Sequence, residues 1–198
     1  MKYVESVISN TLIALYQPFW FALLLSFVLM FVWKNYHSVK EAVKQWGSWF
    51  RTEKVFRKMF FLTFYTVMIL FRTLLNRSLY ANPTKNVIGI WGLHKLNNAG
   101  ELVLTTEVPE NLALFIPFTI LLLWTYRERI IGEEVHLTRV LWQSTKIVFI
   151  FSFTIEFLQL FLRLGTWQLS DLFYNTLGGF IGGLIYWIGY RIQKHNKT

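Results

Sequence analysis

Long apolar segments alternate with shorter polar ones along the chain. Five segments approach or exceed the length of about 20 residues that a helix needs to cross a bilayer: residues 11–33, 56–75, 110–126, 141–162 and 172–190. We therefore predict an all-α, polytopic membrane protein with five transmembrane helices, forming a single membrane domain over residues 1–198. Gln17 and Pro18 indicate a kink or a late helix start in the first segment. Pro117 predicts a kink in the third, because proline has no N–H to donate.

Two of the polar connections have patterns of their own. Residues 35–58 are rich in lysine and arginine and carry apolar residues at helical spacing, which predicts a basic amphipathic helix lying on the cytoplasmic membrane surface. Anchoring explains this segment more simply than partner binding, which stays as the alternative. Within residues 76–110, the stretches 87–93 and 101–106 have strand-like composition and flank a turn sequence, NNAG at 97–100. They predict a small extracytoplasmic β-hairpin loop.

The distribution of positive charges predicts the orientation of the chain in the membrane. Fourteen of the 20 lysines and arginines fall in the connection after the first span, the link after the third span, the start of the fourth and the C-terminal tail. Cytoplasmic loops carry an excess of these residues, so the N-terminus is expected outside and the C-terminus inside. The net charge of +9 then follows from topology, and no nucleic acid partner is expected.

Composition agrees with a membrane protein and excludes several kinds of site. Hydrophobic residues make up 54% of the chain and charged residues 16%, against about a quarter charged in soluble domains. Cysteine is absent, which excludes disulfides, thiolate chemistry and cysteine-ligated metals. The four histidines lie outside the predicted spans without ligand spacing, so we expect no metal and no cofactor.

Polar residues form stripes on two of the predicted helices. Ser152, Glu156, Gln159 and Arg163 follow one another at spacings of three and four, which places them on one helical face. In the next span Asp171 and Asn175 align with glycines in the same way. Ionisable groups inside apolar helices are costly unless they are paired or hydrated, and they mark functional sites by default.

The predicted topology brings these groups together in the outer half of the bilayer. Glu156 would lie about 10 Å below Arg163, at 1.5 Å per residue, and the second, third and fifth spans contribute polar residues at the same level. The candidate ligand-binding residues are Arg72, Arg77, Asn111, Glu156, Gln159, Arg163, Asp171 and Asn175.

Each feature also has a purely structural interpretation. Glu156 and Arg163 could form a structural ion pair, since buried pairs often serve specificity, and Asn175 could simply bond across helices, a contact worth about 1 kcal/mol. Small residues at spacings of four favour close helix packing far more than a binding site. These small residues are Gly178, Gly179, Gly182 and Gly183.

Several motifs resemble the VanZ-like membrane family. They are NLALFIPF at 111–118, IEFLQ at 155–159 and LSDLFYNTLGGFIGG at 169–183, and TLLNR at 73–77 is also similar. The resemblance covers residues 72–190. It implies a bacterial, multi-pass plasma-membrane protein linked to the cell envelope. The family takes its name from an antibiotic-resistance accessory protein that lowers sensitivity to teicoplanin, and the resemblance implies no established reaction.

Three functions remain open. In the first, the polar cluster binds an envelope lipid, a lipid-linked precursor or a lipoglycopeptide antibiotic, with the arginines holding an anionic group. In the second, the protein is an enzyme that modifies such a lipid, with Glu156 as general acid or base and Asp171 as a further candidate; no serine–histidine or cysteine nucleophile pattern accompanies them. In the third, it is a small transporter, which the absence of an internal repeat disfavours. Membrane lipids are the expected partners, and a homo-oligomer stays open.

Overall fold

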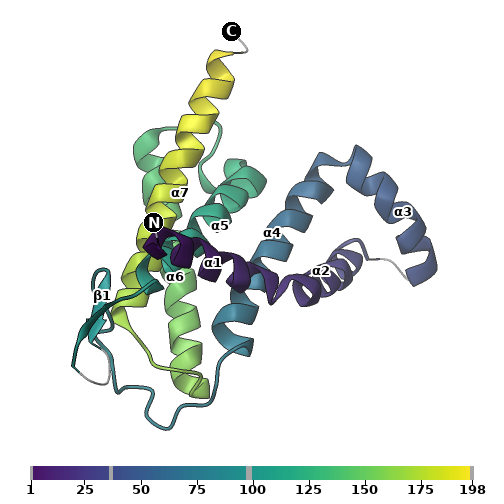
Figure 1. Cartoon of the computed structure of the whole chain (residues 1–198). Coiled ribbons are helices and arrows are strands. Elements are labelled where there is room, and N and C mark those ends of the chain that lie inside the picture. The colour runs from purple at the N-terminus through teal and green to yellow at the C-terminus, as the bar shows by residue number, and fades with distance from the viewer. Residues whose placement is uncertain (1, 36–37, 97–99, 197–198) are drawn as a thin grey trace.

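The computed structural model describes residues 2–35, 38–96 and 100–196, and these are mostly helical (Figure 1). Three helical segments are long and apolar enough to cross a membrane: α4 together with the π-helix η1, α5, and α6. The elements in order are α1 (Lys2–Tyr16), α2 (Phe19–Trp33), α3 (Val39–Thr52), α4 (Lys54–Leu70), η1 (Phe71–Leu75), β1 (His94–Leu96), β2 (Leu102–Leu104), α5 (Glu107–Ile130), α6 (Leu137–Leu162) and α7 (Leu169–His195).

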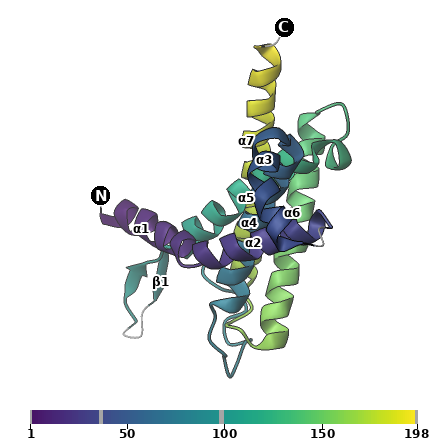
Figure 2. The same ribbon diagram turned by 90° about the vertical axis from the view of Figure 1, so that its right-hand side faces the viewer.

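Helix α7 packs against α5 and α6, and these two contacts are the most extensive between any two elements. The main apolar core joins α4, α5 and α6 beside it. The core consists of Leu62, Ile69, Leu114, Phe115, Phe118, Val148 and Ile155. Helices α6 and α7 run side by side, whereas α4 leans away from them toward α2 and α3 (Figures 1 and 2).

Four glycines of α7 face its two neighbours. Gly178 and Gly182 lie against α5, and a Cβ atom added at Gly182 would come within 2.7 Å of the Ile116 carbonyl oxygen. Gly179 and Gly183 lie against α6, beside Val148 and Ser144. Because glycine has no side chain, the three backbones approach closely, as in other small-xxx-small seams.

The predicted break at Gln17 and Pro18 in the first apolar segment is confirmed. Residues 11–33 are divided between α1 and α2, because Pro18 has no N–H and cannot continue the hydrogen bonding of α1. Both helices have 15 residues, or about 22 Å at 1.5 Å per residue, less than the roughly 30 Å of a bilayer core. They lie at a steep angle to α6 and α7 (Figures 1 and 2).

Helix α2 nevertheless packs along the length of α4. Ala22 contacts Val67 and Met68, and Met30 contacts the N-terminal part of α4. At one end Asn76 donates to Gln17 Oε1 at 3.0 Å; at the other Lys34 Nζ lies 2.7 Å from Glu53 Oε2. The two ends of α2 are therefore held at the two ends of α4 and η1.

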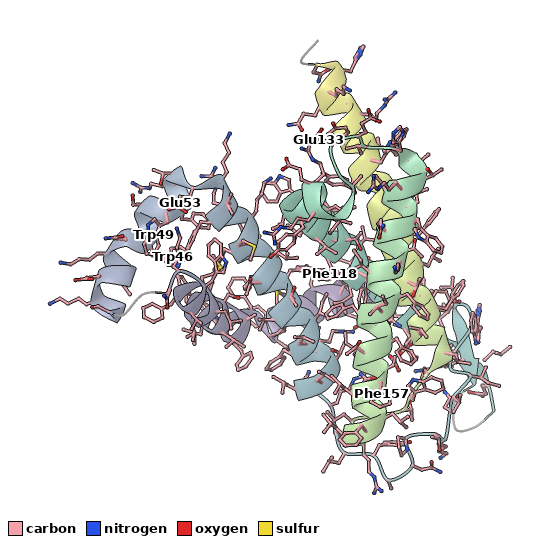
Figure 3. All side chains as sticks on the ribbon, turned by 180° about the vertical axis from the view of Figure 1, so that it is seen from behind. Trp46, Trp49, Glu53, Phe118, Glu133 and Phe157 are labelled. Carbon is pink, nitrogen blue, oxygen red and sulfur yellow. The ribbon has the colours of Figure 1, made fainter. Side chains whose placement is uncertain are left out.

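The basic segment forms a helix, as predicted. Trp46 of α3 stacks on Phe50, with ring centroids 5.2 Å apart. Both rings pack against the buried Phe56 and Phe60 of α4. Trp46, Trp49 and Glu53 lie at the α3 end of the molecule, far from Phe157 on α6 (Figure 3).

The connection between η1 and α5 contains the expected hairpin, with a different first strand. β1 and β2 pair antiparallel, with His94 opposite Leu104, whereas residues 87–93 form no strand. Gly89 and Gly92 interrupt that stretch with φ values of 75° and 97°, in the left-handed region that extended strands do not use. Of the predicted turn, residues 97–99 lie outside the described part.

Helices occupy the positions of the other four predicted spans and extend beyond them. Pro117 lies inside α5, but the helix departs from helical dihedral angles at Tyr126 instead, with φ −115° and ψ 24°. The π-helix η1, which continues α4, was not expected.

Substitution of Gly182 tests the packing seam. Gly182→Ala would place a methyl group against the backbone of α5, and overpacking of this kind lowers the free energy of unfolding by about 1–3 kcal/mol. Gly189→Ala is the matched control, because nothing lies within 4 Å of its added Cβ. Thermal unfolding in detergent should show a lower Tm for Gly182→Ala than for Gly189→Ala. Equal Tm values would mean that α7 and α5 do not approach as described.

Candidate functional site

A cavity of about 410 Å³ opens where η1, α5, α6 and α7 meet. Seven of the eight predicted ligand-binding residues line it, and only Arg163 does not. The full lining is Arg72, Thr73, Asn76, Arg77, Glu107, Asn111, Leu114, Phe115, Glu156, Gln159, Gln168, Asp171 and Asn175.

Helix α6 contributes a row of buried polar side chains at the cavity. Ser152, Glu156 and Gln159 share one face of the helix and are at most 3% exposed. Glu156 Oε2 accepts a bond of 3.2 Å from the backbone N–H of Gln168, the residue that precedes α7. The carboxylate therefore lies at the N-terminus of α7, where the helix dipole favours negative charge.

The π-helix η1 forms the opposite wall. In this wider helical turn the N–H of Asn76 donates to the carbonyl of Phe71 at 2.8 Å. The carbonyl of Thr73 accepts a hydrogen bond from Gln159 Nε2 of α6 at 2.7 Å. Single π turns inside helices frequently accompany functional sites. Here the π turn follows α4, and Thr73 and Asn76 line the cavity.

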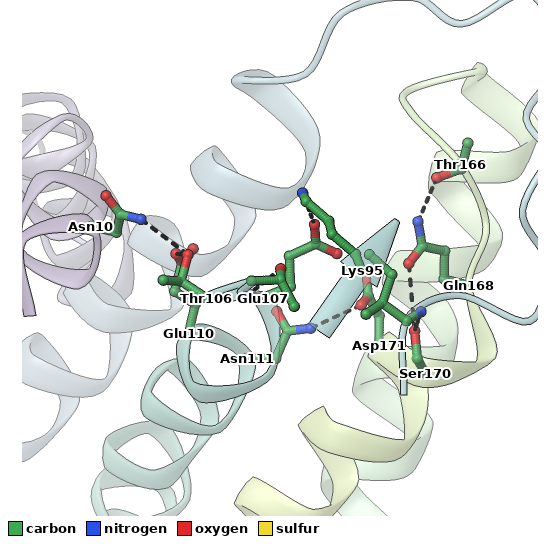
Figure 4. Close-up of polar contacts among 12 residues, drawn as sticks. Asn10, Lys95, Thr106, Glu107, Glu110, Asn111, Thr166, Gln168, Ser170 and Asp171 are labelled. Carbon is green, nitrogen blue, oxygen red and sulfur yellow. Dashed lines mark hydrogen bonds and ion pairs between the residues drawn. The ribbon is translucent and has the colours of Figure 1, made fainter. Parts of the chain in front are cut away.

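Two side-chain bonds tie α7 to its neighbours beside the cavity. Asn111 Nδ2 of α5 donates to Asp171 Oδ1 at 2.9 Å (Figure 4), and Asn175 Nδ2 donates to Ser152 Oγ of α6 at 2.9 Å. Asn175 thus does bond across helices. Its Oδ1, however, is buried and has no hydrogen-bond partner among the described residues.

The two predicted arginines of this region differ in their surroundings. Arg72 forms an ion pair with Glu110 of α5. Arg77 has no carboxylate within 4 Å in the described part of the chain, and its charge acts at longer range on both Glu156 and Asp171. Arg77 is thus the cation of this cavity whose guanidinium is not committed to an ion pair.

Arg163 lies elsewhere because α6 ends before it. The residue has a left-handed backbone with φ 56° and is exposed, and its carbonyl accepts from the N–H of Tyr80 at 2.8 Å. No ion pair joins it to Glu156 in the part that the structure describes. The periodicity that placed Arg163 on the same helical face as Glu156 holds only while the helix continues.

Helix α1 crosses the same end of the bundle and is tied to the rim of the cavity. Tyr3 donates from its hydroxyl to the Thr105 carbonyl at 2.9 Å, and Asn10 Nδ2 donates to Thr106 Oγ1 at 3.0 Å. Thr106 in turn donates to Glu110, the partner of Arg72 (Figure 4). A polar chain therefore connects α1 to the cavity wall.

Sequence reasoning missed four polar residues of the lining, Thr73, Asn76, Glu107 and Gln168. A usable signal existed for Gln168, because it directly precedes the last predicted span and polar residues favour helix starts. Thr73 and Asn76 depend on the π turn, which no simple periodicity reveals. No group of three or more potential metal ligands occurs among the described residues.

The hydrogen-bonding and charged groups of the lining determine what the cavity can bind. The three carboxylates of the lining, those of Glu107, Glu156 and Asp171, and the Asn175 carbonyl oxygen can accept hydrogen bonds from hydroxyl, amide or ammonium groups. Arg77 can hold a phosphate or carboxylate. Leu114 and Phe115 add an apolar part of the lining.

Comparison with known proteins identifies the family. The VanZ/LLP1 family model matches residues 6–190, so the match extends beyond the resembling region 72–190 to include most of α1 and all of α2 and α3. No curated protein and no solved structure gives a significant match. The family match and three helices able to cross a membrane indicate a membrane protein. The chain belongs to the VanZ/LLP1 family.

Proposed function

We propose that the protein binds the polar headgroup of a cell-envelope amphiphile in the cavity between η1, α5, α6 and α7. The observation that carries this proposal is Asn175 Oδ1, which is buried beside Glu156 and Asp171 and has no partner in the described chain. A buried polar atom without a hydrogen bond is unfavourable by about 1–3 kcal/mol. A ligand that donates a hydrogen bond to this oxygen removes that penalty.

The lining suggests a headgroup with both hydroxyl and anionic parts. Glu156 and Asp171 would accept bonds from hydroxyl or amide groups, and Arg77 would bind a phosphate or carboxylate. Arg72 is already neutralised by Glu110 and Arg163 does not line the cavity, so Arg77 alone takes the role that the sequence assigned to all three arginines. Envelope lipids, lipid-linked precursors and lipoglycopeptides such as teicoplanin all combine these groups with an acyl or polyprenyl chain.

The cavity faces the outer half of a bacterial plasma membrane in this proposal. We count α2, α4 with η1, α5, α6 and α7 as five crossings, with the N-terminus outside. Because α2 is shorter than a bilayer core, its crossing requires the membrane to be locally thinner there. The contacts at both ends of α2, Gln17 with Asn76 and Lys34 with Glu53, support a passage of α2 beside α4. α7 has 27 residues, about 40 Å at 1.5 Å per residue.

An enzyme that modifies the bound lipid is the second candidate. Two carboxylates from different helices, Glu156 and Asp171, line one cavity and interact electrostatically. Paired carboxylates can act as general acid and base. Glu156 would then move a proton on a headgroup that Arg77 and Asn175 hold in place.

Single cysteines test the orientation. The natural chain has no cysteine, so the background is clean. In intact cells, a membrane-impermeant maleimide should label Lys85→Cys, which lies in the exposed connection before the hairpin. It should label Asn196→Cys, at the end of α7, only after lysis. The reverse pattern would move the cavity to the inner leaflet.

Drug tolerance tests the ligand class. Teicoplanin carries an acyl chain that inserts into the outer leaflet, and vancomycin has none. Expression in a susceptible Gram-positive host should raise the minimal inhibitory concentration of teicoplanin and leave that of vancomycin unchanged. Asn175→Ala and Asp171→Ala should erase this difference, whereas Asn86→Ala, in an exposed loop, should keep it. Equal protection against both drugs would contradict binding of the lipidated drug in the cavity.

In the same assay Glu156→Gln separates a site residue from a structural one. Glutamine keeps the shape and can still accept from the Gln168 N–H, but it loses the charge and its proton chemistry. A site role predicts lost tolerance at a Tm equal to that of the exposed control Glu133→Gln. A fall in Tm together with tolerance would assign Glu156 to the scaffold. Full tolerance at normal Tm would remove it from the site.

A further inference from the structure

A second and larger cavity lies at the opposite end of the bundle. Its volume is about 700 Å³, and the N-terminus of α4 and the C-terminal turns of α5 and α7 enclose it. Five of the lining side chains are cationic and one is acidic. The lining consists of Lys54, Val55, Arg57, Lys58, Trp124, Thr125, Tyr126, Arg127, Glu128, Arg129, Tyr186, Tyr190 and Gln193.

Only some of these cations are committed to partners within the protein. Arg127 Nη2 lies 2.8 Å from Glu128 Oε1. Arg57 donates to the backbone carbonyls of Phe50 and Arg51, at 3.0 and 2.7 Å, and so fixes the link between α3 and α4.

Lys54, Lys58 and Arg129 have no carboxylate within 4 Å in the described chain. The cavity therefore carries positive charge that the protein itself does not neutralise.

Aromatic rings hold two of these three cations in the cavity wall. Lys58 Nζ lies 5.2 Å from the centre of the Trp124 ring, and Arg129 Cζ lies 5.9 Å from that of Tyr126. Cation–π contacts of this kind position a charge without neutralising it.

We propose that this second cavity, which lies at the cytoplasmic end of the bundle in the orientation proposed above, is a separate binding site for a phosphate-bearing anion. Positive-inside topology explains the sign of the charges at this end, but it does not require them to line a single concave space with four aromatic rings. Lysine and arginine are the usual partners of phosphate oxygens. Val55 and Trp124, which are 61% and 42% exposed, border the cavity with apolar surface that could contact an acyl chain.

The phosphate could belong to an anionic lipid or to a soluble molecule, and two measurements distinguish these sources. Native mass spectrometry of the detergent-purified protein should show retention of dioleoylphosphatidylglycerol over dioleoylphosphatidylcholine. Inorganic phosphate or glycerol phosphate at millimolar concentration should displace the lipid only if the site takes the free anion equally well. Displacement would assign the site to a soluble phosphate compound, and no displacement to a lipid headgroup.

Substitutions of the cationic side chains test the proposed phosphate site. The double variant Lys58→Gln, Arg129→Gln should weaken phosphatidylglycerol binding at least about fivefold, because two charge-assisted contacts are lost. Lys44→Gln is the control, since Lys44 is an exposed cation of α3 that does not line the cavity. Lys58→Arg, which keeps the charge, should retain binding, and Tm values should confirm that all variants fold.

Two results would overturn this proposal. One is equal retention of the two lipids by the wild type, with no binding of the soluble phosphates. The other is an equal loss of affinity in Lys44→Gln and in the double variant. Neither result bears on the cavity of Glu156 and Asn175, since none of these substitutions touches its lining.

Discussion

The close approach of α7 to α5 and α6 is the constraint on which the rest of the structure depends. Gly178 and Gly182 admit the backbone of α5, and Gly179 and Gly183 admit α6. With the helices this close, short polar side chains reach across: Asn111 to Asp171 and Asn175 to Ser152. The polar cavity lies beyond the glycine seam, at the end of α7 where these bonds form. Longer side chains in the seam would separate the helices and open the cavity.

Helical periodicity and polarity were enough to predict most of the helices and most of the polar residues that line the cavity. The spacing of Ser152, Glu156 and Gln159 identified the buried face of α6 correctly, because a regular helix repeats every 3.6 residues. The prediction failed where regular geometry ends. Arg163 follows the last turn of α6, and glycines with positive φ interrupt the first predicted strand. The partner of Arg72 was also missed, because ion pairing between spans depends on packing that one sequence does not reveal.

Two cavities of different chemistry occupy the two ends of one bundle. The first combines carboxylates, amides and one unpaired arginine, Arg77, and suits a headgroup with hydroxyl and anionic parts. The second combines unneutralised cations with aromatic rings and suits phosphate. Helices α4 with η1, α5 and α7 contribute to both linings. A protein that engages lipid at both faces of the membrane could be anchored at one end while it binds an outer-leaflet ligand at the other.

An experimentally determined structure of the protein purified with its native lipids would test the headgroup proposal most directly. The account predicts an amphiphile whose headgroup places a donor within hydrogen-bond distance of Asn175 Oδ1 and an anionic group at Arg77. Its acyl or polyprenyl chain should leave the cavity toward the lipid phase. A cavity closed by direct pairing of Arg77 with Glu156 and Asp171, with Asn175 Oδ1 bonded to the protein itself, would contradict it.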